Sequence, residues 1–126
     1  MHQPPLILMV DDDPQIQDLY KTKLSASGFK VSQAFNGEEG LKMAKEEKPD
    51  LILLDILMPV VDGAKMLVEL RKDPDFKNTP VIILTGLEDR PESIRLAKEA
   101  GAVDFVNKDI DFKDLVAKIK TTLRLP

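Results

Sequence analysis

Five short apolar segments alternate along this chain with segments whose apolar residues recur at helical spacing. Strict alternation of strands and helices produces parallel strands joined by crossover helices, so the pattern predicts an α/β fold with a doubly wound sheet. The predicted strands are Leu6–Val10, Lys30–Phe35, Leu51–Leu54, Val81–Leu84 and Val103–Val106. Five helices are predicted between and after these strands. Two of them contain apolar residues at helical spacing: Ile16, Leu19, Tyr20 and Leu24 in the first, and Phe112, Leu115, Val116, Ile119 and Leu123 in the last. The other three are predicted at about 37–47, 63–72 and 91–100.

Composition indicates which strands lie at the centre of the sheet. Segments 6–10, 51–54 and 81–84 are wholly apolar, as burial on both faces requires, whereas 30–35 and 103–106 contain polar residues. The strand order 2-1-3-4-5 places only those two at the edges and obeys the right-handed crossover rule. We therefore expect a five-stranded parallel sheet in this order.

The length of 126 residues predicts one domain spanning residues 1–126, with a core of about 5–124. Its helix boundaries are marked by particular residue types. Asp13-Pro14 is expected to open the first helix and Gly28 to end it. Pro74 is expected to end the third helix.

Several classes of function are excluded by composition. The chain has no cysteine and a single histidine, His2, which excludes disulfides, thiolate or histidine zinc sites and histidine-based triads. The net charge of −4 argues against direct nucleic-acid binding by this domain. No apolar run approaches the roughly 20 residues of a membrane helix, or forms a signal-peptide core. We expect a soluble cytoplasmic protein without membrane contact.

The residues that directly follow the apolar segments carry the chemistry. They are Asp11-Asp12-Asp13, Asp55, Thr85 and Asn107-Lys108. Parallel strands end at one edge of the sheet, about 4.8 Å apart, so Asp11, Asp12 and Asp55 are expected to meet there. Carboxylates this close repel, and at least one would stay protonated unless a cation were bound. An all-oxygen ligand set favours Mg²⁺.

A lysine and a hydroxyl beside such an ion form a site for a phosphoryl group, whose charge needs a metal, an ammonium group and hydrogen-bond donors. The phosphate-binding patterns GxxxxGK[ST] and GxGxxG are both absent from the chain. The phosphoryl group is therefore expected on the protein itself rather than on a bound nucleotide. Asp55, placed centrally, is the expected acceptor.

Four motifs in this order resemble the receiver domains of two-component response regulators, over about residues 5–124. The motifs are Val10-Asp11-Asp12-Asp13, Leu54-Asp55-Ile56-Leu57-Met58-Pro59 with Asp62-Gly63, Leu84-Thr85-Gly86 and Phe105-Val106-Asn107-Lys108. The resemblance implies the flavodoxin-like fold and transfer of a phosphoryl group from a phosphohistidine of a sensor histidine kinase or a histidine phosphotransfer protein. It implies a signalling domain that catalyses only its own phosphorylation and dephosphorylation.

The resemblance also assigns residues to the metal site and to partner binding. Asp55 is the implied phosphoacceptor, and Asp11, Asp12, Asp55 and the backbone carbonyl of Leu57 are the implied Mg²⁺ ligands. A downstream effector domain or protein is expected to bind the face formed by residues 91–123, and two copies are expected to be able to form a homodimer. The kinase, the output and whether the chain is part of a longer protein stay open.

Thr85, Lys108 and Phe105 take the remaining implied roles. Thr85 donates its hydroxyl to the phosphoryl group, Lys108 neutralises it, and Phe105 is the switch aromatic that turns inward when Thr85 moves. The chain departs from the family pattern at three positions: Asp109 replaces the proline after Lys108, Gly86 replaces the usual alanine, and the switch residue is not tyrosine. Because a cis bond before a non-proline residue costs about 2.5–4 kcal/mol, we expect the Lys108–Asp109 peptide to be trans.

Two rival functions are compatible with parts of the pattern. A haloacid-dehalogenase-like phosphatase would use Asp11 as nucleophile, but that family needs a longer chain with a cap and a later acidic motif. A pseudo-receiver would bind partners without phosphorylation, although the acidic pair, acceptor, threonine and lysine are all present.

Leu57 and Leu87 occupy positions from which a polar side chain would orient the hydrolytic water. Because leucine cannot hydrogen-bond to water, we expect slow loss of the phosphoryl group from Asp55.

Overall fold

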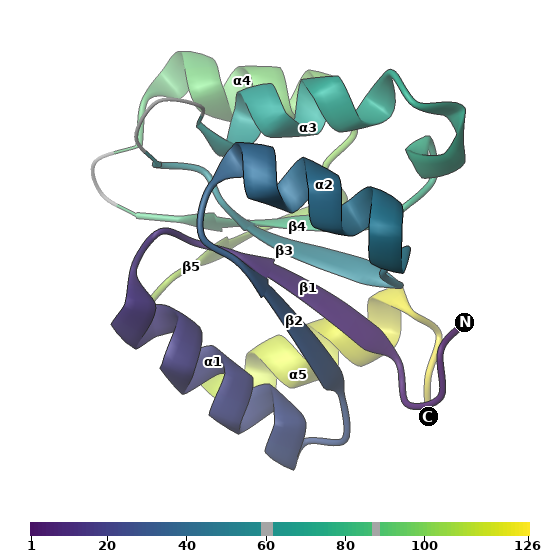
Figure 1. The fold of residues 1–126 in the computed structure, drawn as a ribbon. Coiled ribbons are helices and arrows are strands. Elements are labelled where there is room, and N and C mark those ends of the chain that lie inside the picture. The colour runs from purple at the N-terminus through teal and green to yellow at the C-terminus, as the bar shows by residue number, and fades with distance from the viewer. Residues whose placement is uncertain (59–61, 87–88) are drawn as a thin grey trace.

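The computed structural model describes residues 1–58, 62–86 and 89–126, so Pro59 and Leu87, both named above, lie outside the described residues. Five parallel strands form one sheet in the order β2-β1-β3-β4-β5, as predicted (Figure 1). The strands are β1 Leu6–Val10, β2 Lys30–Ala34, β3 Leu51–Asp55, β4 Val81–Thr85 and β5 Asp104–Asn107. The helices are α1 Pro14–Ala26, α2 Gly37–Glu47, α3 Gly63–Arg71, α4 Pro91–Glu99 and α5 Phe112–Thr122, with a short 3-10 helix, η1, at Pro74–Phe76.

Helices cover both faces of the sheet (Figure 1). One core cluster lies beneath α2, α3 and α4, and the other lies beneath α1 and α5. Successive residues of a strand point to opposite faces, so Leu54 of β3 belongs to the first cluster and Leu53 to the second. Every residue of β1 and β3 is buried, whereas β2 and β5 are partly exposed, which confirms the predicted central and edge strands.

The predicted boundaries were wrong by one residue at several ends. β3 and β4 continue through Asp55 and Thr85, so these two residues are the last of their strands rather than loop residues. β5 begins at Asp104, and Val103 is exposed. Pro74 does not end α3, which stops at Arg71; it opens η1 instead, where Asp73 caps the turn by accepting from the Asp75 N–H.

The predicted apolar stripe of α1 was also partly wrong. The residues that α1 buries are Gln17, Tyr20 and Leu24, whereas Leu19 is 45% exposed. Tyr20 packs edge-on against Phe112 of α5, with ring centroids 4.8 Å apart, and this contact fixes the rotation of the helix. A polar side chain, Gln17, therefore lies at a core position.

Local capping positions the loops around the carboxyl edge of the sheet. The Asp13 side chain accepts hydrogen bonds from the N–H groups at the start of α1, as predicted, and Gly28 after that helix has a φ of +95°. Asp62 caps α3, and a Cβ at Gly63 would clash with the backbone of Asp55. Only glycine allows α3 to start this close to the end of β3. In the described ranges, no helix combines the length and apolar character needed to cross a bilayer.

Candidate functional site

Three carboxylates meet at the carboxyl ends of β1 and β3. Asp11, Asp12 and Asp55 each offer one oxygen, and these oxygens lie within 4.8 Å of one another. β1 and β3 are adjacent in the sheet, which is why residues 43 and 44 positions apart share this edge. Asp11 and Asp55 are almost completely buried, at 0% and 1% exposure, while Asp12 is exposed. The structure thus brings together the three carboxylates that the sequence predicted to meet.

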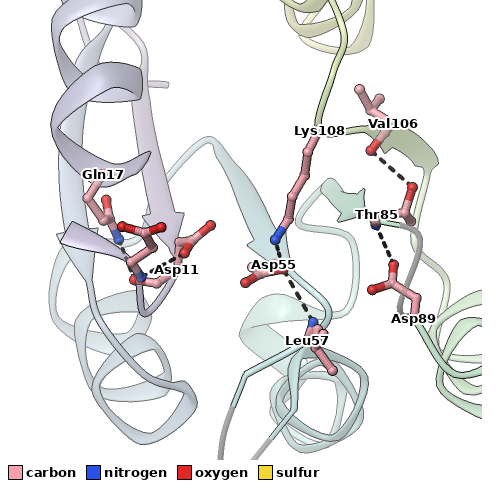
Figure 2. Close-up of polar contacts among 10 residues, drawn as sticks. Asp11, Gln17, Asp55, Leu57, Thr85, Asp89, Val106 and Lys108 are labelled. Atoms are coloured by element: carbon pink, nitrogen blue, oxygen red, sulfur yellow. Dashed lines mark hydrogen bonds and ion pairs between the residues drawn. The ribbon is translucent and has the colours of Figure 1, made fainter. Parts of the chain in front are cut away.

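Lys108 reaches this cluster from the loop after β5 (Figure 2). Its Nζ lies 2.8 Å from Asp55 Oδ1, which also accepts the Leu57 N–H at 3.3 Å. The backbone N–H of Lys108 donates to the Thr85 carbonyl at 2.9 Å, so the end of β4 fixes the position of the Lys108 backbone. The Lys108–Asp109 peptide is trans, as predicted.

Burial changes the acid–base behaviour of this cluster. Burial raises the pKa of Asp55 to about 6 and the Asp11 charge adds to the rise, although the hydrogen bond from Lys108 opposes it. Burial also raises the pKa of Asp11, against the hydrogen bond from the Asp13 N–H. Partial burial would lower the pKa of Lys108, but its hydrogen bond to Asp55 and the nearby carboxylate charges outweigh that and raise it. Desolvation, more than the predicted mutual repulsion, makes the ionised carboxylates unfavourable.

One buried oxygen of the cluster has no partner among the described residues. Asp11 Oδ1 accepts the Asp13 N–H at 2.9 Å, but none of the residues that the structure describes donates to Asp11 Oδ2. A buried carboxylate oxygen without a donor is costly. Its neighbours in the cluster, Asp12 and Asp55, are also carboxylates, and such a set of oxygen donors suits a small hard cation. The residues present fit Mg²⁺.

Thr85 and Phe105 lie beside the cluster but engage other groups. The Thr85 hydroxyl donates to the Val106 carbonyl of β5 at 3.3 Å (Figure 2). The Phe105 ring is half-buried, with Lys98 Nζ of α4 5.7 Å from its centroid. Thr85 therefore links β4 to β5 in this structure, one residue away from the predicted switch aromatic.

Sequence reasoning missed Gln17 and Asp89. Gln17 is 1% exposed, and its Nε2 donates to the backbone carbonyl of Asp11 at 3.1 Å. The signal was present in the spacing of Gln17, Tyr20 and Leu24, which places a polar residue on the buried face of α1. Asp89 accepts the Gly86 N–H at 2.8 Å just after β4, a contact across the loop that no sequence pattern indicated.

Comparison with known proteins agrees with this geometry. The family model described as response regulator receiver domain matches residues 7–120. The chain is 38% identical over 120 residues to the DNA-binding dual master transcriptional regulator RpaA of Synechocystis, covering 95% of this chain and 49% of that protein. The chain thus spans about half the length of that relative.

Solved structures with the same fold include receiver domains. A CheY-like response regulator receiver domain protein from Methanospirillum hungatei has a TM-score of 0.88 at 32% identity, with 95% of this chain and 94% of that chain covered. The receiver domain of a sensor histidine kinase from Pseudomonas aeruginosa, with a magnesium ion coordinated in its active-site cleft, has a TM-score of 0.86 at 25% identity, with 95% and 98% covered. With the family match spanning residues 7–120, this chain belongs to the response regulator receiver domain family.

Proposed function

We propose that Asp55 accepts a phosphoryl group from a phosphohistidine of a sensor histidine kinase or a histidine phosphotransfer protein. The observation that carries the proposal is the position of Asp55, buried at the end of the central strand β3 with Lys108 Nζ 2.8 Å away and the oxygens of Asp11 and Asp12 within 4.8 Å. One nucleophile, one ammonium group and two further acidic ligands are thus assembled around one small space.

We infer that Asp11, Asp12, Asp55 and the Leu57 carbonyl would hold Mg²⁺. Oδ2 of buried Asp11 supports this assignment, because it has no hydrogen-bond partner in residues 1–58, 62–86 and 89–126 and a cation would satisfy it. When bound, Mg²⁺ supplies positive charge that stabilises the oxygens of the transferring phosphoryl group. The presence of magnesium in the cleft of the Pseudomonas receiver domain supports the same assignment by likeness.

The residues of the chain would perform the remaining steps. Lys108 and the Leu57 N–H both engage Oδ1 of Asp55, which leaves Oδ2 as the oxygen that attacks phosphorus. The new bond joins Oδ2 to phosphorus while the bond from phosphorus to the donor breaks, and the donor leaves with that electron pair. The Thr85 hydroxyl would then leave the Val106 carbonyl to donate to a phosphoryl oxygen.

The phosphorylated state would be read on the face formed by α4, β5 and α5. Thr85 ends β4, and its present acceptor, Val106, lies in β5 directly after Phe105. Release of this hydrogen bond would allow Phe105 to turn inward and change the packing of that face. A downstream effector domain or protein is the proposed partner there, and pairing of two copies of the chain belongs to the same proposal.

Phosphorylation with acetyl phosphate and Mg²⁺, followed by intact mass and peptide mapping, tests the proposal. We expect one phosphoryl group per chain, on Asp55, and no modification of the Asp55→Asn variant. Asp13→Asn is the matched control, because it also removes one carboxylate near the site but keeps a good helix cap. Equal modification of the Asp55→Asn variant would remove Asp55 from the role. Acyl phosphate on Asp11 would instead support the phosphatase alternative, and no acyl phosphate at all would support a pseudo-receiver.

A further inference from the structure

Gln17 is a buried amide whose hydrogen bonds converge on the backbone beside Asp11. Its Nε2 lies within hydrogen-bond distance of three carbonyls, those of Met9 at 3.0 Å, Asp11 at 3.1 Å and Ala34 at 2.7 Å, so one of its two N–H groups is shared between two acceptors. These carbonyls come from the carboxyl ends of β1 and β2 and from the first residue after β1. One side chain of α1 therefore joins the helix to both strands at the edge where the carboxylates meet.

The orientation of this amide is determined by its partners. Reversing the amide would place Oε1 against three carbonyl oxygens, which are all acceptors. With Nε2 facing them, Oε1 is buried without a hydrogen-bond partner among the described residues. An apolar side chain of similar size would avoid that cost but could not bind the carbonyls. Gln17 thus provides donors at a place where packing alone would favour a leucine or methionine.

Both backbone polar groups of Asp11, its N–H and its carbonyl, are hydrogen-bonded in this arrangement. The Asp11 N–H donates to the Ala34 carbonyl at 3.1 Å, and the Asp11 carbonyl accepts from Gln17. The Ala34 carbonyl also accepts from Gln17, so the three residues form one connected network. Within the Asp11 carboxylate, Oδ1 is occupied by the Asp13 N–H, and Oδ2 is the oxygen left for a ligand.

We infer that Gln17 is a positioning residue for the metal ligand Asp11: its amide fixes the Asp11 backbone and so directs the carboxylate into the cluster. This inference rests on the Mg²⁺ site proposed above. Residues that hydrogen-bond to metal ligands without contacting the metal commonly lower metal affinity by about 10- to 100-fold when they are removed. Gln17 does not contact the phosphoryl group in this scheme and is not a catalytic residue.

The Gln17→Leu variant tests the inference in two ways. Calorimetric titration with Mg²⁺ should show a dissociation constant roughly tenfold higher than in the unmodified chain. The rate of phosphorylation by acetyl phosphate, measured against Mg²⁺ concentration, should show the same rise in half-saturation but an unchanged maximum. A general loss of structure would lower the maximum as well, so the two effects are separable.

Gln33→Leu is the matched control. The Gln33 Nε2 donates to the backbone carbonyl of Gln17 at 3.0 Å, so its removal also breaks a side-chain hydrogen bond between β2 and α1. It leaves the three carbonyl contacts of the Gln17 amide in place. We expect the Gln33→Leu variant to bind Mg²⁺ as the unmodified chain does.

A measurement on the unmodified chain removes the dependence on a substitution. In a ¹⁵N NMR titration with Mg²⁺, the side-chain amide signals of Gln17 should shift with the same half-saturation as the backbone amide of Asp11, while those of Gln15, which is exposed, stay in place. Unmoved Gln17 signals, or unchanged Mg²⁺ affinity in the Gln17→Leu variant, would overturn the inference. If the unmodified chain bound no Mg²⁺, the proposed function itself would fail instead.

Discussion

The ionisation of Asp55 is expected to make the stability of the fold depend on pH. Burial raises the pKa of Asp55 from 3.8 to about 6, so the folded chain binds a proton that the unfolded chain has released between these values. This shift contributes on the order of 3 kcal/mol to the free energy of unfolding. The contribution is fully present below pH 4 and is lost as the pH rises through 6. Without Mg²⁺, the free energy of unfolding of the wild type relative to that of the Asp55→Asn variant should therefore fall between pH 4 and pH 7.

Urea denaturation of both proteins at several pH values, in the presence of a chelator, checks this prediction. The difference between the two proteins reports Asp55 together with its coupling to Asp11 and Lys108, and it cancels the contribution of the distant carboxyl groups. Parallel pH profiles would contradict it. Protons and Mg²⁺ compete for the ionised carboxylate, so Mg²⁺ binding to the wild type should also weaken below pH 6.

Leu57 is the residue that we expect to prolong the phosphorylated state. Leu57 lies two residues after Asp55 and is 39% exposed, and its apolar side chain cannot orient a water molecule for in-line attack. Leu57→Asn should therefore accelerate loss of the phosphoryl group several-fold. Leu19→Asn, at a similarly exposed leucine of α1, is the control and should not change the decay. Decay of phosphorylated protein with Mg²⁺, followed by mass spectrometry, gives the rates, and equal rates for all three proteins would show that Leu57 has no such role.

At the scale of elements, the hydrogen bond between β4 and β5 is the expected point of switching. Phosphorylation should withdraw the Thr85 hydroxyl from the Val106 carbonyl, which loosens the surroundings of Phe105 and its contact with Lys98 of α4. Amide shifts on phosphorylation should therefore extend through residues 91–123. Thr85→Ala should still be phosphorylated but should lose those distant shifts, whereas Thr85→Ser keeps the hydroxyl and should retain them. Shifts confined to residues 14–50 would contradict this interpretation.

At the scale of the whole molecule, Mg²⁺ should stabilise the fold, because the carboxylate cluster exists only when β1 and β3 are paired. A ligand that binds only the folded state at 100 times its dissociation constant adds about 2.7 kcal/mol. Thermal unfolding followed by circular dichroism should show a higher Tm with Mg²⁺. Asp12→Ala should abolish the rise with little change in the metal-free Tm, because Asp12 is exposed. A wild-type response in that variant would exclude Asp12 as a ligand.

Much of the architecture was determined by patterns that are local in the sequence. The apolar segments at 6–10, 51–54 and 81–84 required burial on both faces, and polar residues in 30–35 and 103–106 required edges. Together with the right-handed crossover rule and the strand order common among doubly wound folds, these two facts predicted the strand order. Parallel strands share one carboxyl edge, so the meeting of the carboxylates of β1 and β3 followed from the topology without any knowledge of distances.

Only the tertiary structure decided how individual polar groups are used. The Thr85 hydroxyl contacts Val106 rather than the cluster, and Gln17, rather than Leu19, occupies the buried face of α1. Nor could the sequence show that Lys108 contacts Oδ1 of Asp55, or that Asp11 Oδ2 has no donor in the part of the chain that the structure describes. Each outcome depends on which of several competing acceptors lies within about 3 Å once distant segments have packed. Strand and helix periodicity places a residue on a face of its element, but the choice of hydrogen-bond partner belongs to the assembled molecule.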